Sequence, residues 1–302
     1  MSQPHSTFMV ATDLSRFSGY AIGRAQIMAD EQDAQIEIVH CLPDSLLQTL
    51  KDNLLGNHEQ SQRALLSHHT KLLNRSTKRL LGANLARVST QLLQGDPDDI
   101  LPDHADTIGA RLVLLGAHGK GFVKSLLIGS ITSRLVRTLR QPALVVKTPA
   151  RSPYSNVLIA VDFSPASLQA IAISRQAAPS AHLTLVHLYD VPFAGMLRYA
   201  GIKSPDIAQY RHEIHAKSDQ NLHTLAQQSG LDPSNYTAIS VEGGSASALL
   251  NLQTTLKTDL IVLGKHGRHL KHEFLIGSVT QTILARSKSD VLVTVNTKLP
   301  QA

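Results

Sequence analysis

The sequence predicts an α/β protein of two tandem domains, each built on an open, doubly wound sheet of five parallel strands. Three observations support this fold class. A glycine pattern occurs twice, beginning at Gly116 and again at Gly264, which is an offset of 148 residues. Short apolar runs alternate with helical segments in both halves, as they do in right-handed strand–helix–strand crossovers. The apolar runs are also continuous, which is typical of strands that helices cover on both faces.

The first half contains five predicted strands and one long helical segment. The strands cover Phe8–Ala11, Ile36–Cys41, a run that leads to Gly95, Arg111–Leu115 and Ala143–Lys147. The long helix covers Ser45–Leu81 and is expected to break near Gly56 and Asn57, because both residue types disfavour a helix interior. Shorter helices fill the other connections. The order is therefore strand, helix, strand, long helix, strand, helix, strand, glycine loop, helix and strand.

The second half repeats this order with small changes of offset. Its strands cover Val157–Val161, Leu183–Leu188, a run that leads to Gly243, Asp259–Leu263 and Val291–Val295, and its long helix covers Pro205–Gln228. The segment Thr148–Pro153 between the halves is polar and contains two prolines, which is typical of a linker. We therefore expect one domain at residues 1–149 and a second domain at residues 150–302.

The duplicated glycine pattern is the strongest functional signal. Each copy follows a predicted strand and precedes a predicted helix, so that backbone amides and a helix N-terminus would form a phosphate-binding loop. In doubly wound sheets, ligands bind at the carboxyl ends of the strands, where the loop after the first strand meets the glycine loop. Asp13 and Asp162 end the first strand of each half, either to cap the next helix or to contact a ribose or a metal ion. The glycine loops also contain cations that could offset phosphate charge, namely Lys120, Lys124, Arg268 and Lys271.

The pattern Gly-x2-Gly-x9-Gly-Ser, with an aspartate at the end of the first strand, resembles the ATP-binding motif of the universal stress proteins. The resemblance covers almost the whole chain, as two fused domains. It implies a flavodoxin-like fold of the adenine nucleotide alpha hydrolase-like type, with ATP as the cofactor and Mg²⁺ as a candidate companion ion. It implies that the nucleotide contacts in the first half are Asp13, Val39, Gly116, Gly119, Gly129 and Ser130. In the second half they would be Asp162, Val186, Gly264, Gly267, Gly277 and Ser278.

Composition and charge argue against several other classes. The chain has 302 residues, a formal net charge of +6 without a run of basic residues, and 4% aromatic residues, so no dedicated nucleic-acid site is expected. No apolar stretch reaches the roughly 20 residues of a membrane helix, and the N-terminus lacks the features of a signal peptide. The single cysteine, Cys41, favours a reducing compartment and is interpreted as a buried structural thiol. We therefore expect a cytoplasmic protein that does not bind membranes.

Other chemical motifs are missing or weak. The sequence has no Walker motif, no G-x-G-x-x-G after the first strand, and no nucleophile elbow around Ser15 or Ser164. No catalytic or metal-binding residue is therefore predicted. His118 and His266 lie inside the glycine turns and are interpreted mainly as solvent-exposed. The same surface interpretation applies to several other histidines, since no cysteine pair or His-Glu motif accompanies them: His68, His69, His104, His212 and His215.

Three functions are consistent with these observations. The first is an ATP-binding regulator or stress-protection factor that presents its nucleotide state to a protein partner of unknown identity. The second is a slow ATPase or phosphotransferase that uses the same pocket, and the third is a nucleotide-free interaction scaffold. The regulator is preferred, because the sequence offers no clear catalytic base or arginine finger. By resemblance to dimeric family members, the two halves are expected to pack as an internal pseudo-dimer through their last strands, and a homodimer of the whole chain stays open.

Overall fold

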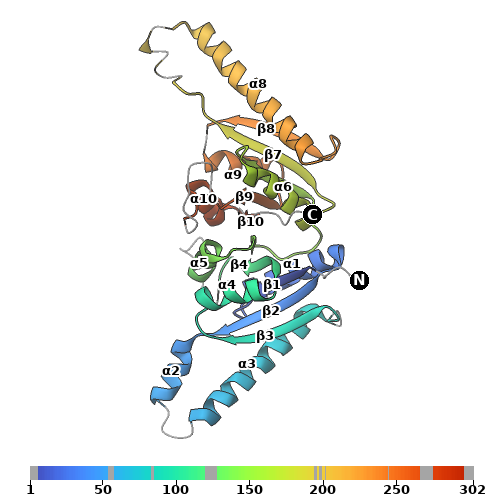
Figure 1. The fold of residues 1–302 in the computed structure, drawn as a ribbon, viewed down its shortest axis with the longest axis vertical. Helices are drawn as coiled ribbons and strands as arrows, with labels where there is room; N and C mark the ends of the chain where they lie inside the picture. Colours follow the sequence, from blue (N-terminus) through green and yellow to red (C-terminus); the bar gives the residue numbers. More distant parts are fainter. Residues whose placement is uncertain are drawn as a thin grey trace. The chain divides into compact units, whose positions relative to one another are not determined.

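The computed structural model describes residues 6–53, 58–82, 85–119, 128–193, 196, 199–200, 202–243, 245–265 and 275–295. The chain divides into two compact units, Met1–Pro153 and Tyr154–Ala302, and the division follows the last residue of the predicted linker. Each unit is coloured as a continuous part of the chain in Figure 1. None of the helices in the described part of the chain is long and apolar enough to cross a membrane.

Unit 1 is a five-stranded parallel sheet with the strand order β3-β2-β1-β4-β5. The strands are β1 (Thr7–Ala11), β2 (Gln35–Leu42), β3 (Val88–Gln94), β4 (Ala110–Gly116) and β5 (Ala143–Val146). The helices are α1 (Arg16–Gln32), α2 (Asp44–Asn53), α3 (His58–Leu81), α4 (Pro97–Thr107) and α5 (Ser130–Thr138). From β1, the chain first adds β2 and β3 on one side of the sheet, and then adds β4 and β5 on the other side. The predicted doubly wound fold is confirmed, with its switch point between β1 and β4.

Unit 2 repeats this topology with the strand order β8-β7-β6-β9-β10. The strands are β6 (Asn156–Val161), β7 (His182–Tyr189), β8 (Tyr236–Glu242), β9 (Leu260–Gly264) and β10 (Asp290–Thr294). The helices are α6 (Pro165–Ala177), α8 (Ser204–Gln228), α9 (Ala246–Thr255) and α10 (Ser278–Arg286). The long helices α3 and α8 lie alongside the outer strands β3 and β8 of their own units (Figure 1).

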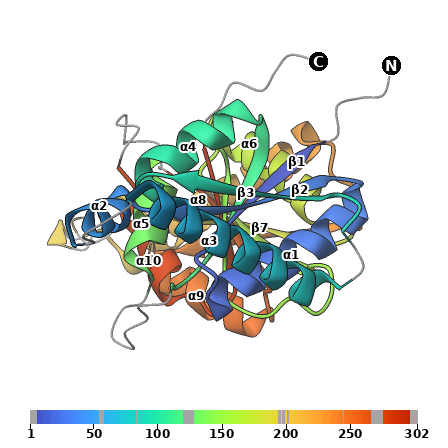
Figure 2. The ribbon, with the colours of Figure 1, turned by 90° about the horizontal axis from the view of Figure 1, so that it is seen from below.

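The apolar core of each unit lies on the central strands. In unit 1, Met9 and Val10 of β1 and Leu114 of β4 are fully buried, because helices cover both faces of the sheet. Figure 2 shows α4 on one side of β1, β2 and β3, with α1 and α3 on the other side. The edge strand β3 has no buried residue, which is typical of an edge that is covered on one face only.

The predicted element boundaries hold to within one or two residues. The long helix of the first half, which was expected to break, is two helices, α2 and α3, and Gly56 and Asn57 themselves lie outside the described residues. The last strand of each unit ends one residue early, at Val146 and at Thr294. The cause is local, because the carbonyl groups of these two residues accept hydrogen bonds from the glycine loops, at 2.9 and 2.8 Å.

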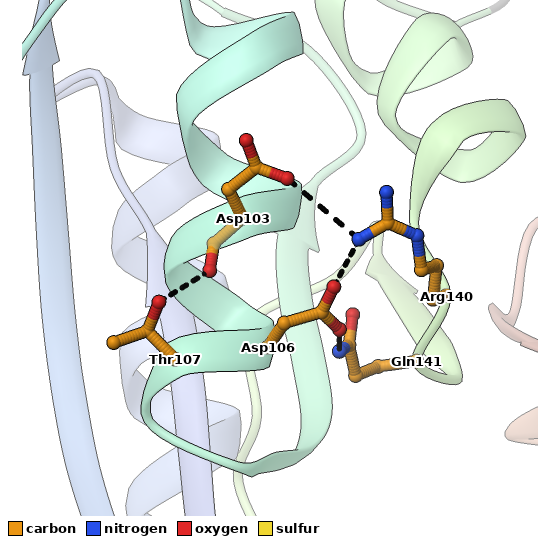
Figure 3. A network of polar contacts seen from close by, with 5 residues as sticks. All are labelled: Asp103, Asp106, Thr107, Arg140 and Gln141. Carbon is orange, nitrogen blue, oxygen red and sulfur yellow. Dashed lines mark hydrogen bonds and ion pairs between the residues drawn. The ribbon is translucent and has the colours of Figure 1, made fainter.

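A polar network fastens α4 to the turn before β5 (Figure 3). The Asp106 carboxylate accepts hydrogen bonds from Arg140 and Gln141, and Arg140 also lies 3.6 Å from the Asp103 carboxylate. The hydrogen bond to Asp106 is the main cause that raises the pKa of Arg140 above its ordinary value. This network lies where β5 begins, at the opposite end of the strands from the glycine loop. It therefore supports the fold and does not contribute to the site described next.

Candidate functional site

The carboxyl ends of β1, β2 and β4 lie at the same edge of the sheet, and β2 extends three residues beyond the end of β1. Ala11, the last residue of β1, pairs with Val39 of β2 on one side and with Leu115 of β4 on the other. The loops that follow these strands consequently leave the sheet at the same edge. This edge is where the strand order reverses and where doubly wound folds bind ligands.

The loop after β1 is fixed by its own polar groups. Asp13 Oδ1 accepts a hydrogen bond from the backbone N–H of Ser15 at 3.0 Å, and Ser15 Oγ accepts one from the N–H of Ser18 at 3.3 Å as the N-cap of α1. Between them, Leu14 has a left-handed backbone, with φ at 63°. This conformation costs a non-glycine residue about 1–3 kcal/mol, so the surrounding hydrogen bonds must hold it in place.

The loop after β6 repeats this geometry in unit 2. Phe163 is left-handed, with φ at 62°, and Asp162 Oδ1 accepts a hydrogen bond from the N–H of Ser164 at 3.0 Å. The hydroxyl groups of Ser164 and Ser167 donate to the same oxygen, at 2.6 and 2.9 Å. In both units the N-cap is the serine, not the aspartate, and the aspartate shapes the turn before the helix.

The first two glycines of the loop after β4 make close contacts within the protein. A Cβ atom on Gly116 would lie 2.6 Å from the carbonyl carbon of Phe17 and 2.7 Å from the backbone nitrogen of Ser18. A Cβ atom on Gly119 would lie 2.8 Å from Asp13 Oδ2. Gly116 is therefore required by the approach of α1, and Gly119 is required by the position of the Asp13 carboxylate. Gly116 thus has a packing role that the sequence did not reveal, and its contact with a nucleotide stays a prediction.

Gly129 differs from these two glycines. A Cβ atom there would meet the Ala117 carbonyl oxygen at 3.4 Å, which is ordinary contact, and its backbone is not left-handed. Its N–H donates to that carbonyl at 2.8 Å, so the loop closes on itself. Gly129 is the N-cap of α5 and has no side chain to cap the helix. The first N–H groups of α5 therefore lack a side-chain cap and can bind an anion.

A cavity with a volume of about 520 Å³ opens at this edge of unit 1. All six residues predicted for the first site line it: Asp13, Val39, Gly116, Gly119, Gly129 and Ser130. The volume is within the range of small-molecule sites. The structure thus brings these residues together around one space, although they come from two strands, the loops after β1 and β4, and the start of α5.

Sequence reasoning missed the other walls of the cavity. Leu42, Pro43 and Leu46 approach from the end of β2 and from α2, Pro97 and Leu101 from α4, and Ile131 and Leu135 from α5. Each is apolar, and nothing in the glycine pattern points to them. His40 and His69 also line the cavity, from β2 and α3. The second strand of each half contains a Val-His pair, Val39-His40 and Val186-His187, and this repeat was the available signal for His40.

Two of the surface interpretations of histidines are wrong. His69 lines the cavity, and its Nδ1 atom lies 3.1 Å from His40 Nε2. His104 is largely buried beside Glu37, with 2.7 Å between its Nε2 atom and a carboxylate oxygen. His212 is exposed and His215 is partly exposed near Tyr189, as a surface position on α8 implies. Among the described residues, no group of three or more His, Cys, Asp or Glu side chains is arranged to hold a metal ion.

The electrostatics of the cavity are set by few charges. Of the described residues that line it, Asp13 carries the one carboxylate, and none is Lys or Arg. Burial and the nearby charge of Lys147 lower the pKa of His118, whose ring packs edge-on against Phe17. His118 is therefore neutral at pH 7 and half-buried, rather than solvent-exposed as predicted. The predicted cations Lys120, Lys124, Arg268 and Lys271 lie outside the described residues, as does His266.

Cys41 lines the cavity and is half-buried rather than fully buried as predicted, and burial raises the pKa of its thiol to about 12. The thiol is thus protonated at neutral pH, in line with a structural role. We expect iodoacetamide at pH 8 to alkylate Cys41 at least about a hundredfold more slowly than a free thiol, because the thiolate is the reactive form. Mass spectrometry can follow this reaction, since the chain has one cysteine. Alkylation should become fast in urea, and equal rates with and without urea would contradict the raised pKa of the thiol.

The described part of the loop after β9 in unit 2 has the same hydrogen bonds as the loop after β4 in unit 1. The Gly277 N–H donates to the Lys265 carbonyl at 3.0 Å, and Thr280 Oγ1 donates to the Gly264 carbonyl at 2.9 Å. The matching bonds in unit 1 join Gly129 to Ala117 and Thr132 to Gly116, both at 2.8 Å. Val186 is buried on β7, and Ser278 begins α10. Gly267, the remaining predicted contact, lies outside the described residues.

Comparisons with known proteins agree with this architecture. The model of the universal stress protein family matches residues 5–147 and 153–295. Universal stress protein Rv1996 of Mycobacterium tuberculosis is 28% identical over 225 residues, which are 72% of this chain and 67% of that protein. A universal stress protein structure from Archaeoglobus fulgidus aligns with a TM-score of 0.67 at 15% identity, and covers 96% of this chain and 98% of its own. A putative universal stress protein from Pseudomonas aeruginosa aligns with a TM-score of 0.60 at 18% identity, covering 96% and 93%. With nearly its whole length matched by two copies of the family model, the chain belongs to the universal stress protein family as a tandem, two-domain member.

Proposed function

We propose that this chain binds ATP in the unit 1 cavity and acts as a nucleotide-dependent regulator or protection factor in a stress response. One observation carries the proposal. A single cavity of about 520 Å³ collects all six residues predicted to contact the nucleotide in the first half. A regulator of this kind would act in the cytoplasm and present its nucleotide state to a protein partner.

The walls of the cavity suit the parts of a nucleotide. Val39, Leu42 and Leu101 offer an apolar surface to a flat base. The Asp13 carboxylate is an acceptor for ribose hydroxyl groups and is held in place by the Ser15 N–H. The N-terminus of α5 offers amides and the positive end of the helix dipole to phosphates.

Asp13 also fits a role toward Mg²⁺. Protein sites for this ion typically supply one or two carboxylates, and the substrate phosphates and water supply the other ligands. Asp13 is the carboxylate that lines the described part of the cavity. Mg²⁺ bound there would neutralise part of the phosphate charge and would balance the carboxylate. By analogy, we propose that Asp162, Val186, Gly264, Gly267, Gly277 and Ser278 serve a second nucleotide in unit 2.

Calorimetric titration with ATP and Mg²⁺ tests the proposal. We expect two equivalents to bind to the wild type, one of them weakened tenfold or more by Gly129→Val and the other by Gly277→Val. The branched side chain at Gly129 would occupy the cavity next to α5, while its Cβ atom fits the loop at 3.4 Å from its nearest neighbour. cAMP, the ligand named for one solved universal stress protein, is the second probe. No heat with either nucleotide would contradict nucleotide binding and favour a scaffold.

Phosphate release separates a regulator from an enzyme. The described cavity offers no Lys or Arg to stabilise the charge of a transferring phosphoryl group. We therefore propose that any hydrolysis is slow. Steady-state turnover above about 1 s⁻¹, the low end for ordinary enzymes, would overturn the regulator in favour of an ATPase.

A further inference from the structure

Two histidines form a directly bonded pair in the wall of the unit 1 cavity. His40 lies on β2 and is 6% exposed, and His69 lies on α3. His40 Nδ1 lies 2.7 Å from the Thr12 carbonyl oxygen, and His40 Nε2 lies 3.1 Å from His69 Nδ1. The two rings are nearly parallel, with 5.3 Å between their centroids. Both residues line the cavity.

The partners of His40 determine where its protons lie. A carbonyl oxygen can only accept, so His40 Nδ1 carries a hydrogen and donates it to Thr12. In the neutral pair, the bare Nε2 atom of His40 accepts a hydrogen bond from His69 Nδ1. One added proton preserves this bond, because it can lie on either ring. A second added proton would direct two N–H groups at each other and would put a positive charge on each ring. The pair therefore holds at most one added proton.

The surroundings favour a role for that proton in binding. Asp13 presents a negative charge to the same cavity and follows Thr12 directly, so it opposes an anionic ligand and stabilises a protonated pair. The other titratable groups that contact the pair or line the same cavity are Cys41 on β2, His68 on α3 and His118 in the glycine loop. Cys41 and His118 are uncharged at pH 7, because burial raises the pKa of the first and lowers that of the second.

We propose that the His40–His69 pair determines the charge specificity of the cavity, because it takes up one proton when a phosphate-bearing ligand binds and so discriminates against uncharged analogues. The inference rests on the proposed nucleotide site. The anion stabilises the protonated pair, which raises the pKa of the pair in the complex above its value in the free protein. Affinity for the anion therefore increases as pH falls through the range of histidine, near 6.5, and is lost as pH rises through the pKa of the complex.

Unit 2 provides an internal comparison. His187 on β7 repeats the first contact of His40, with its Nδ1 atom 2.8 Å from the Val161 carbonyl oxygen. Its ring packs against Phe163, with 4.2 Å between the centroids. His215 on α8 is instead directed to Tyr189, at 3.1 Å from its hydroxyl group. The described contacts thus place a second histidine beside His40 and a phenylalanine beside His187.

The test is the pH dependence of binding for a charged and an uncharged ligand. cAMP carries one fixed negative charge between pH 5.5 and 8.0, and adenosine carries none. We expect cAMP to bind about tenfold more tightly at pH 5.5 than at pH 8.0, which corresponds to a pKa shift of about one unit in the pair. Adenosine should change by less than twofold. Calorimetry in two buffers of different ionisation enthalpy should show proton uptake with cAMP near pH 6.5.

Two substitutions at His69 test the expected pH dependence of cAMP binding. His69→Gln keeps a polar contact to His40 but removes one of the two rings that share the added proton, so its affinity for cAMP should change less with pH than that of the wild type. His69→Lys carries a fixed charge and should bind cAMP tightly at every pH. His68→Gln, on the same helix but exposed, and His187→Gln in unit 2 are matched controls that should keep the wild-type slope. Thermal unfolding confirms that each variant is folded.

The outcomes separate this inference from the proposed function. An unchanged pH slope in His69→Gln, or an equal slope for adenosine and cAMP, would overturn the role of the pair while nucleotide binding stands. ATP is a second anionic probe. Its phosphates titrate in the same pH range, but this contribution is equal for the wild type and His69→Gln, so the difference between their pH slopes reports the histidine pair. If neither cAMP nor ATP binds between pH 5.5 and 8.0, the proposed function and this inference both fail.

Discussion

Replacing Gly116 with alanine is expected to destabilise unit 1 by about 3 kcal/mol, near the upper end of overpacking costs. The added Cβ atom would lie 2.6 Å from the carbonyl carbon of Phe17 and 2.8 Å from its oxygen. These are backbone atoms in the first turn of α1, so no side chain can rotate away to make room. Either α1 or the end of β4 must shift. Urea unfolding followed by circular dichroism measures the effect, since the chain has no tryptophan for fluorescence.

Gly23→Ala is the matched control. Gly23 lies inside α1, and a Cβ atom there would meet nothing within 4 Å. Alanine is the better helix former, so this variant should be as stable as the wild type or more stable by up to about 1 kcal/mol. Equal urea midpoints for Gly116→Ala and Gly23→Ala would show that α1 does not pack against Gly116 as described.

Much of the fold could be predicted from the sequence because local signals were strong and repeated. The apolar runs of β1, β4, β6 and β9 are short, continuous and bounded by polar turns, and each reappears in the other half. The offset of 148 residues between Gly116 and Gly264 fixed the domain count. Helix α8 was predicted to within one residue, since Ser204 and Pro205 mark its start.

The first site was predicted in part, and the missing part has a physical reason. The glycine pattern and Asp13 are close to the sheet edge by topology alone, and all six predicted residues line the cavity. The opposite wall depends on where α2, α3 and α4 cross that edge, which no local motif encodes. His69 was therefore interpreted as a surface residue, although its contact with His40 joins residues 29 positions apart in the sequence. The different roles of Gly116, Gly119 and Gly129 could not be predicted either. They depend on which atoms surround each glycine in the fold, and the sequence pattern does not distinguish the three.

Replacing Gly119 with alanine should weaken ATP binding in unit 1 by roughly ten- to a hundredfold with little loss of stability. The added Cβ atom would lie 2.8 Å from Asp13 Oδ2 and 3.8 Å from Asp13 Cγ. The carboxylate is the end of a side chain, so it can move aside at a lower cost to the fold than the backbone that faces Gly116, although this movement strains its hydrogen bond to the Ser15 N–H. The binding site would then lose a positioned charged acceptor, and a hydrogen bond to a charged group contributes about 1.5–3 kcal/mol.

A double-mutant cycle with Asp13→Ala tests whether Gly119 acts through Asp13. If it does, Asp13→Ala alone should weaken ATP binding by about the same factor, and the double variant should be no worse than either single variant. Calorimetric titration gives the three dissociation constants, and urea midpoints verify that Gly119→Ala remains folded. Additive losses would mean that Gly119 affects the nucleotide by a separate route, such as direct contact in the cavity. A loss of binding accompanied by a loss of stability would mean that Asp13 cannot move aside, and that its hydrogen bond to the Ser15 N–H holds the whole turn.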